Sequence, residues 1–424
     1  MNIRAVRALR GPSIWASFTV LEVLVDLEEL KDSPSNTIPG FNQRVKEWLP
    51  SLIEHRCGLG VRGGFFKRLD DGTYLGHVLE HVTLELQTLA GTDVGYGRAR
   101  ETDEEGVYKV AIEYEEEHLA RECLKSAWEL CLAAVHGTPF DAQTTICRLR
   151  DLAGRVCLGP STRSIVDAAR KRGIPVRRLN DGSLVQLGYG SRQRRIMAAE
   201  TDETGTIAQE IAQDKQLTKT ILRSVGVPVP AGAIAESAEE AWTAACEIGL
   251  PVTLKPSDGN QGRGVSVNLW TKEQVETAFE AAAKRSPRVL VEENIKGKDY
   301  RLLVVGNRLV AAARRVPAHV FGDGIHTVAE LIEKENADPR RGDYHALPLS
   351  RIPLDDISRA VLADQGLTPD SIPPAGTVVL IRRNANLSTG GKSVDVTDAV
   401  HPVNASFAVD AAKSVGLDIA GVDI

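Results

Sequence analysis

The amino-acid sequence predicts two successive domains of different fold class, an α+β domain over residues 1–157 and an α/β domain over residues 158–424. In the first part, a few alternating strands are combined with two long amphipathic segments. In the second part, short strands and helices alternate along the chain, which is typical of α/β architecture. Each part is long enough to bury a hydrophobic core of its own.

Within the first domain, alternation of apolar and polar residues predicts strands at residues 3–9, within 15–27 and at 107–114. Residues 75–89 and 118–135 have the 3.6-residue periodicity of helices. This order of elements is typical of an antiparallel sheet packed by helices.

Within the second domain, a helix is predicted at residues 215–225, and Gly226 with two following prolines ends it. A hairpin is expected to turn at Gly306 and Asn307. Between them, the predicted elements are helices at 238–248 and 272–284 and strands at 252–255 and 289–293.

Composition excludes several classes of function. The net charge of −6 argues against a general nucleic-acid-binding protein. No apolar run approaches the roughly 20 residues needed to cross a membrane. Six cysteines, at positions 57, 123, 131, 147, 157 and 246, show no paired spacing. We therefore expect reduced thiols in a cytoplasmic protein, not a disulfide framework or a cysteine-based zinc site.

A glycine-rich loop follows the predicted strand at residues 252–255. Lys255 would enter a loop that carries Gly259, Gly262 and Gly264. Glycines let backbone N–H groups approach a phosphate chain, and the lysine adds a positive charge. No Gly-Lys-Ser/Thr string ends the loop, so it is not a Walker A motif. A tight turn without any ligand is the alternative interpretation.

Further strings give the second domain a resemblance to the ATP-grasp family. Asp214-Lys215 and Thr218-Lys219 open a helix that leads to a Gly-Val-Pro-Val-Pro segment, and Lys255 with its glycine loop follows. This order resembles the nucleotide-binding region of ATP-grasp ligases. The resemblance implies that Lys215 and Lys255 bind the phosphates of ATP under the glycine lid.

The segment after the strand at 289–293 resembles the hinge of the same family. The resemblance implies that Glu292, Glu293 and Ile295 surround the adenine and that Asp299 receives the ribose hydroxyls. An unrelated α/β domain with solvated lysines is the alternative.

Membership of this family would imply a ligase. Such enzymes activate a carboxylate as an acyl phosphate, and an amine then displaces the phosphate to form an amide. Mg²⁺ ions bridge the phosphates, and Asp423 resembles the first of the acidic ligands. The sequence ends at Ile424, before the Glu-x-Asn strand that the family carries next, so we expect little polymerisation by these 424 residues alone.

Longer strings resemble the cyanophycin synthetase family. They are LGPSTRSI (158–165), QLGYG (186–190), RVPAHV (315–320), DPRRG (338–342) and NLSTGG (386–391), with RGP (10–12), Glu54-His55, RGG (62–64) and RET (100–102) in the first domain. The resemblance implies an ATP-dependent peptide ligase that extends the poly-aspartate backbone of cyanophycin (multi-L-arginyl-poly-L-aspartate) with L-aspartate. A Mur-ligase-like domain beyond residue 424 would add arginine. It also suggests a homo-oligomer that binds polymer or primer, without nucleic acid or membrane.

Candidate substrate contacts follow from the chemistry of this polymer. Ser161 and Thr162 are expected to hold the acceptor end together with the catalytic candidates Arg301 and Arg315, because guanidinium groups bind carboxylates bidentately. Two further hydroxyls, Ser388 and Thr389, are expected to bind the incoming aspartate. Each arginine has a solvated surface charge as its alternative. In the glycine loop, Gln261 departs from the histidine common in the family.

A second chemical signal lies on the predicted helix at 75–89. His77, His81 and Glu85 are spaced four residues apart and project from one helix face, which predicts a Zn²⁺ site with an open position for water. Glu80 completes a His-x-x-Glu-His string and is predicted to act as catalytic base for that water. The site would cleave the polymer and supply primers, with Arg62, Arg98 and Arg100 near the backbone. A structural helix with hydrogen-bonded histidines is the alternative.

Two other functions remain open at this stage. One is a zinc-dependent peptidase that cleaves cyanophycin on an inactive ATP-grasp scaffold. The other is a polymer-binding module without catalysis. ATP turnover that needs polymer and aspartate favours the ligase, chelator-sensitive cleavage without ATP favours the peptidase, and binding with neither favours the module.

Overall fold

In the computed structural model, which describes residues 1–257, 264–342 and 347–424, the chain divides into two compact units. The first unit comprises Met1–Gly159 and Ala169–Val185, and the second comprises Pro160–Ala168 and Gln186–Ile424. The predicted domain boundary at residues 157–158 stays a prediction. Among the described residues, no helix combines the length and apolar character needed to cross a bilayer.

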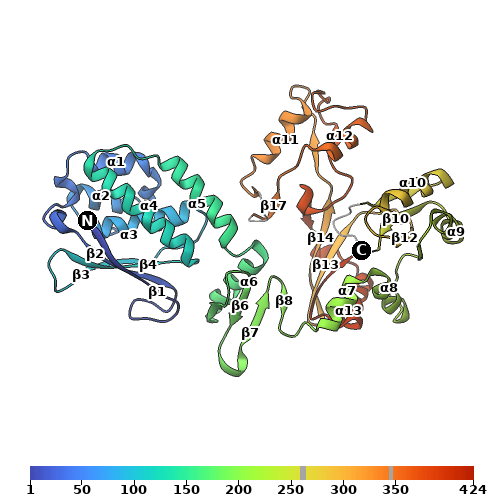
Figure 1. Ribbon diagram of the computed structural model, residues 1–424, viewed down its shortest axis with the longest axis horizontal. Coiled ribbons are helices and arrows are strands. Elements are labelled where there is room, and N and C mark those ends of the chain that lie inside the picture. The colour runs from blue at the N-terminus through green and yellow to red at the C-terminus, as the bar shows by residue number, and fades with distance from the viewer. Residues whose placement is uncertain (258–263, 343–346) are drawn as a thin grey trace. The chain divides into compact units, whose positions relative to one another are not determined.

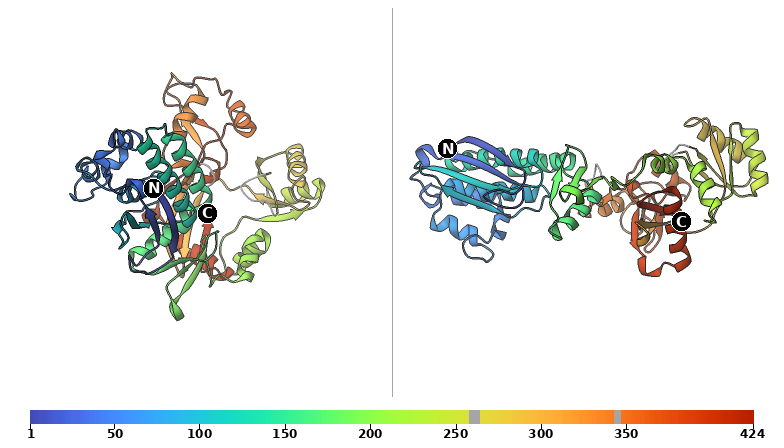
Figure 2. Two further views of the ribbon diagram at one scale, coloured as in Figure 1. Left: turned by 60° about the vertical axis from the view of Figure 1, so that its left-hand side comes forward. Right: turned by 90° about the horizontal axis from the view of Figure 1, so that it is seen from below.

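The first unit is built on an antiparallel sheet in the order β1-β2-β4-β3. Its strands are β1 (Asn2–Leu9), β2 (Val20–Asp26), β3 (Gly97–Glu101) and β4 (Val107–Glu113). Alternate residues such as Leu21, Val23 and Ile112 are fully buried in the main core, as expected of a sheet with one covered face. Figure 1 shows the helices gathered on one side of this sheet, and Figure 2 presents the other face in the view from below.

Five α-helices and three short 3₁₀ helices lie in the Met1–Gly159 part of this unit. They are α1 (Phe41–Trp48), α2 (Gly64–Asp71), α3 (Leu75–Leu89), α4 (Glu117–His136), α5 (Ala142–Val156), η1 (Glu28–Leu30), η2 (Ser35–Thr37) and η3 (Pro50–Glu54). Helix α3 is buried along nearly its whole length, and α4 packs against it. The α+β class predicted for this part of the sequence is confirmed.

A short segment of small elements lies around the division between the units. It contains α6 (Pro160–Lys171), β5 (Val176–Arg178), β6 (Leu184–Leu187), η4 (Gly190–Arg192), β7 (Arg194–Met197) and β8 (Glu200–Thr201). Pro160 stands in the first turn of α6, where its missing N–H leaves no helical hydrogen bond unmade.

The second unit begins with a sheet in the order β11-β10-β12-β9. Its strands and helices are β9 (Gly232–Ala235), α9 (Ala238–Ile248), β10 (Val252–Pro256), β11 (Ser266–Leu269), α10 (Lys272–Ala283) and β12 (Val289–Glu293). Val252, Leu254 and Val291 point into a core shared with α9 and α10. The opposite face of β10 and β12 therefore carries the polar residues that alternate with them.

A second sheet of this unit has the order β19-β14-β13-β20. Its elements are α7 (Thr206–Gln213), α8 (Lys215–Ser224), β13 (Tyr300–Val305), β14 (Arg308–Val316), β19 (Lys392–Asp395), η6 (Thr397–Ala399), α13 (Pro402–Val415) and β20 (Ile419–Asp423). The predicted hairpin at Gly306 is confirmed, because β13 and β14 pair directly across it. Helix α13 packs on the sheet through small alanine side chains.

A small lobe is inserted between β14 and β19. It contains β15 (His319–Phe321), α11 (Val328–Asn336), β16 (Arg341–Gly342), β17 (Leu349–Ser350), α12 (Asp356–Ala363), β18 (Val378–Leu380) and η5 (Leu387–Thr389). β15 pairs with β18, and both pack with α11 in a separate small core. Figure 1 shows this lobe, in orange, with α11 and α12 on either side of its strands.

Candidate functional site

Two lysines and a glutamate meet on the polar face of β10 and β12. Glu292 pairs across the sheet with Thr253 and so shares a face with Lys255, two residues further along β10. Lys219 reaches the same carboxylate from α8, and both lysines form ion pairs with Glu292. The predicted Lys215 lies one helical turn earlier, and its Nζ donates to the Ser257 carbonyl at 3.4 Å.

This lysine–glutamate cluster carries an excess of positive charge in a half-buried setting. Glu292 is only 4% exposed. Burial and the neighbouring lysine charges lower the pKa of Lys219 and of Lys255 to about 8 each. Two ammonium groups against one carboxylate leave a net positive charge, which favours an anionic ligand such as a phosphate chain.

Three predicted hinge residues, Glu293, Ile295 and Asp299, lie at the end of β12 or after it and are exposed. Ile295 is 62% exposed and is therefore accessible to an apolar ring. Gly264 has a left-handed φ of +76° that only glycine adopts readily. The predicted lid residues Gly259, Gln261 and Gly262 lie outside the described residues.

Arg301, Arg315 and Asp423 form a second charged cluster on the other sheet of this unit. Strand pairing places Arg301 opposite Asp423. The Arg301 guanidinium binds the carboxylate bidentately, from Nε at 2.5 Å and Nη2 at 3.1 Å. Arg315 Nη2 lies 3.6 Å from the same carboxylate. The structure thus joins two predicted substrate-binding arginines to the predicted magnesium ligand.

The two predicted hydroxyl pairs differ in exposure. Ser161 is exposed in the first turn of α6, whereas Thr162 is 3% exposed and its Oγ1 donates to the Ala198 carbonyl. Ser388 is exposed, whereas Thr389 Oγ1 donates to Asn384 Oδ1 at 2.7 Å. One member of each pair is therefore presented to solvent, and the other is engaged within the fold.

In the first unit, two histidines and a cysteine bring three donor atoms together. His77 Nε2 lies 3.2 Å from His81 Nε2 and 3.2 Å from Cys57 Sγ. All three ligand atoms lie within 4.8 Å of one another. Burial lowers the pKa of His77 to about 4 and that of His81 to about 2. Both imidazoles are therefore neutral at pH 7, which is the form that binds a metal.

The outer nitrogens of these histidines are also held. His77 Nδ1 lies 2.9 Å from Thr73 Oγ1. His81 Nδ1 lies 2.7 Å from His55 Nδ1, and His55 Nε2 lies 2.7 Å from Glu85. The prediction named Glu85 as the third ligand. In the structure Cys57 lies beside the histidines, and the Glu85 carboxylate is linked to His81 through His55.

Glu80, the predicted base, is buried beside this group. Its Oε1 lies 3.9 Å from His81 Nε2. Burial raises the pKa of Glu80 to about 8, and the charge of Arg98 partly opposes this shift. A Cβ at position 97 would overlap the Glu80 carboxylate, so Gly97 on β3 leaves the space that the carboxylate fills.

The three arginines expected near this site are held at the surface. Arg62 donates to Glu54 at 2.7 Å. The guanidinium groups of Arg98 and Arg100 lie over the rings of Tyr96 and Trp15, at 5.4 and 5.5 Å from the ring centroids. Stacking on an aromatic face leaves the guanidinium edge free to meet a carboxylate.

Three residues of these sites were not assigned a role from the sequence. Lys219 stood in the Thr218-Lys219 string, and four-residue spacing from Lys215 could have marked it as the next lysine on the same helix face. His55 stood in the Glu54-His55 string. Cys57 was expected to be a reduced thiol outside any zinc site, because a lone cysteine without paired spacing is most often a core thiol, and its place beside His77 and His81 departs from that expectation.

Comparison with family models places the histidine–cysteine group and the lysine–glutamate cluster inside matched regions. A model described as the cyanophycin synthase-like N-terminal domain matches residues 22–136, which include the Cys57, His77 and His81 group. A model described as the carbamoyl-phosphate synthase L chain ATP-binding domain matches residues 214–346, which include the lysine–glutamate cluster. The second unit is accordingly an ATP-grasp domain.

Relatives extend this similarity. The cyanophycin synthetase of Nostoc sp. is 46% identical over 430 residues, which cover 100% of this chain and 48% of that protein. A glutathione biosynthesis bifunctional protein of Mannheimia succiniciproducens is 35% identical over 62% of this chain and 36% of its own length. A crystal structure of a bifunctional glutathione synthetase from Pasteurella multocida is 29% identical, covers 72% of this chain and 45% of that one, and gives a TM-score of 0.49. The chain spans about half the length of the cyanophycin synthetases that it matches.

Proposed function

Because the chain belongs to the cyanophycin synthetase family, we propose that its second unit is an ATP-dependent peptide ligase that extends the poly-aspartate backbone of cyanophycin. The observation that carries this proposal is the lysine–glutamate cluster. Lys219 and Lys255 share the buried carboxylate of Glu292, which lies on the strand that leads into the predicted hinge. The excess positive charge there suits the triphosphate of ATP.

The proposed reaction has two steps. The C-terminal carboxylate of the polymer attacks the γ-phosphorus of ATP, ADP leaves, and an acyl phosphate forms. The amine of L-aspartate then attacks the acyl carbon, and inorganic phosphate leaves as the amide forms. Lys219 and Lys255 neutralise the phosphates in this scheme, so catalysis rests on positioning and charge and not on a covalent enzyme intermediate.

The arginine cluster would serve the acceptor and a magnesium ion. Asp423 would hold Mg²⁺, which neutralises phosphate charge when bound. Among the described residues, Asp423 is the one carboxylate that binds Arg301 and Arg315. Because Mg²⁺ takes several oxygen ligands, the residues present fit a magnesium site only in part. The Nε–Nη2 edge of Arg301 binds the Asp423 carboxylate in the structure, and the same bidentate geometry would bind the carboxylate at the acceptor end of the polymer in its place.

Phosphate release by the intact protein tests this function. Release should require ATP, a cyanophycin primer and L-aspartate together, and the primer should lengthen. Omission of L-aspartate is the control, because it leaves ATP and the polymer bound without an attacking amine. If phosphate release does not depend on L-aspartate, the proposal is overturned. Polymer binding without ATP turnover or cleavage would then favour the binding-module alternative.

We also propose a second activity, a zinc-dependent hydrolase in the first unit that cuts the polymer and supplies primers. The observation that favours it is the convergence of Cys57, His77 and His81, with the outer nitrogens of both histidines held. These three donors fit Zn²⁺, which activates a water molecule when bound. Glu80 would accept the proton of that water, because its carboxylate is buried beside the group, 3.9 Å from His81 Nε2.

Metal content and cleavage without ATP test the hydrolase. Glu80→Gln should keep the metal and lose cleavage, because an amide does not accept the proton of the water. Exposed Glu129→Gln on α4 is the matched control and should change neither. Purified protein without zinc, or unchanged cleavage by Glu80→Gln, would leave this helix with a structural role. Cleavage without any ligase activity would favour the peptidase alternative.

Location and assembly complete the proposal. None of the six cysteines, all of which lie in the described residues, forms a disulfide, in keeping with a reducing compartment such as the cytoplasm. We propose a homo-oligomer, and light scattering of the purified protein would measure its mass directly. A monomeric mass would overturn that part.

A further inference from the structure

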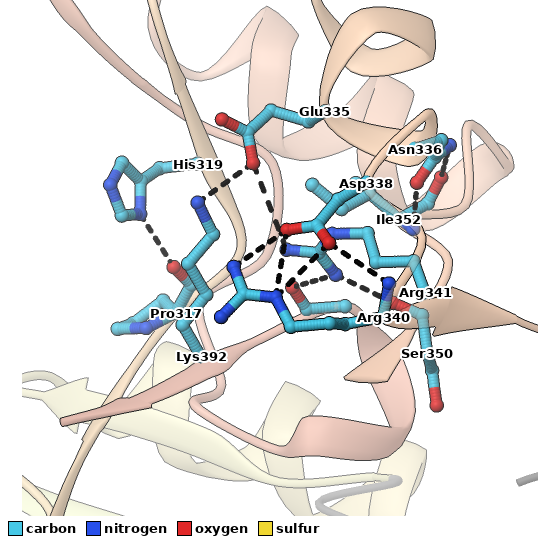
Figure 3. Close-up of polar contacts among 11 residues, drawn as sticks. Pro317, His319, Glu335, Asn336, Asp338, Arg340, Arg341, Ser350, Ile352 and Lys392 are labelled. Carbon is cyan, nitrogen blue, oxygen red and sulfur yellow. Dashed lines mark hydrogen bonds and ion pairs between the residues drawn. The ribbon is translucent and has the colours of Figure 1, made fainter. Parts of the chain in front are cut away.

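The small lobe of the second unit holds a buried arginine. Arg341, on β16, is 4% exposed, whereas its sequence neighbour Arg340 keeps 70% of its side chain exposed and pairs with Asp338. Figure 3 shows the Arg341 guanidinium enclosed among Glu335, Asp338 and Ser350. Burial of a guanidinium costs free energy unless the group makes contacts that use it.

Those contacts are directed at two backbone carbonyls. Arg341 Nη1 donates to the Ser350 carbonyl at 2.6 Å and to the Gly390 carbonyl at 3.1 Å. Among the described residues, Nε and Nη2 have no hydrogen-bond acceptor, and the nearest carboxylate is Glu335, 3.9 Å from Nη2. The side chain is thus committed to joining β17 and the segment that ends at Gly390.

The same region holds that segment at a second point. Glu335, at the end of α11, forms a 2.7 Å ion pair with Lys392, the first residue of β19. Figure 3 shows the Glu335 carboxylate between Lys392 and Arg341. Residues 386–392 are therefore fixed by a guanidinium at Gly390 and by an ion pair two residues later.

A third contact fixes the same segment through Ile352. Gly390 has a φ of +89°, and a Cβ there would lie 2.8 Å from Ile352 Cα, so the two backbones are in close contact. Ile352 is itself held by Asn336, whose side chain accepts from its N–H at 2.8 Å and donates to its carbonyl at 3.1 Å. These three residues, Glu335, Asn336 and Arg341, form what we call the 335–341 clamp.

The clamped segment carries the exposed hydroxyl of Ser388, the candidate contact for the incoming amino acid. We infer that Arg341 is a positioning residue for the amino-acid substrate, because it fixes the 386–391 segment and with it the place of Ser388. This inference rests on the proposed ligase function. It assigns no contact between Arg341 and the substrate itself.

Kinetics of paired variants test the inference. Arg341→Met should raise KM for L-aspartate by about tenfold or more, since a charge-assisted contact is lost. KM for ATP should stay nearly unchanged. Arg340→Met is the matched control, with wild-type constants expected. Arg341→Lys, which keeps the charge without the fork, should fall between them. Equal effects on both substrates, or a fall in kcat alone, would overturn the inference.

A second measurement does not depend on catalysis. Hydrogen exchange should quicken at the Gly390 and Gly391 amides of Arg341→Met and not of Arg340→Met, because the clamp no longer holds them. If the wild type shows no aspartate-dependent turnover, the ligase proposal fails, yet unchanged exchange would overturn the clamp separately. Should Arg341→Met not fold, Lys392→Met, which removes the ion pair with Glu335, provides the same test. An unaltered KM for L-aspartate in that variant would count against the clamp.

Discussion

Burial lowers the pKa of basic side chains both in the lysine–glutamate cluster of the second unit and in the histidine–cysteine group of the first unit, but it leaves them in different charge states. Burial lowers the pKa of the lysines only to about 8, so they stay largely charged at pH 7. It lowers the pKa of His77 to about 4, so that histidine is neutral. The first arrangement therefore attracts an anion and the second offers lone pairs to a cation. The same desolvation gives different ligands because the two side chains start from different intrinsic pKa values.

The largest expected effect is the loss of metal binding by the histidine–cysteine group. His81→Ala should reduce bound zinc from one per chain to almost none, since it removes one of three donors and the link to His55. Elemental analysis of purified protein measures this. His118→Ala, exposed on α4, should keep the wild-type metal content. Full zinc occupancy in His81→Ala would contradict the site.

The second-largest expected effect is weaker ATP binding by the lysine–glutamate cluster. Lys255→Ala and Lys219→Ala should each weaken ATP binding by about 10- to 100-fold, because a charge-assisted contact contributes about 1.5–3 kcal/mol. Calorimetric titration measures the affinity. Lys272→Ala, whose side chain is 52% exposed, is the control and should bind normally. Normal binding by Lys219→Ala alone would return the phosphate role to Lys215.

A smaller effect distinguishes a ligand from a residue that orients one. Glu85→Gln should weaken zinc binding by about 10-fold, the lower end of what outer-shell partners contribute, because Glu85 reaches His81 through His55. Competition with a chromogenic chelator measures this. A loss as large as that of His81→Ala would instead restore Glu85 as a direct ligand, as its spacing suggests. Glu129→Gln again serves as control.

A further prediction concerns pH. A lysine carries its charge below its pKa, so the lysine–glutamate cluster loses positive charge as pH rises through about 8. ATP affinity should therefore fall between pH 7 and pH 9, by up to about tenfold for each lysine that must be protonated to bind. Titrations at several pH values measure the slope. In Lys255→Ala the slope should be shallower, and an unchanged slope would contradict the assignment.

The local sequence pattern predicted the fold class and some of the residues of each site. Four-residue spacing placed His77 and His81 on one face of α3, and strand alternation placed Lys255 opposite a buried core. Partners that depend on tertiary packing could not be read from the sequence. Cys57 reaches the histidines only because the loop after η3 folds back onto α3, and Asp423 meets Arg301 through a strand register set 122 residues apart.

The solvent exposure of individual side chains could not be predicted from the sequence either. Ser161 and Thr162 are adjacent and chemically alike, yet only the first faces solvent. The direction of each side chain from α6 depends on where β7 and β8 return, since the Thr162 hydroxyl binds the Ala198 carbonyl between them. Motif strings thus locate a functional segment but do not decide which residue of it meets the ligand.

The close approach of Gly97 to Glu80 has a consequence for mutational tolerance. Position 97 has no functional group, yet any side chain there would displace the carboxylate that fills its space. In a saturation library selected for polymer cleavage, this strand position should accept glycine alone. The neighbouring position 99, whose side chain lies on the next repeat of β3, should tolerate other small residues. Gly97, which has no side chain, would then tolerate substitution as poorly as the proposed metal ligands.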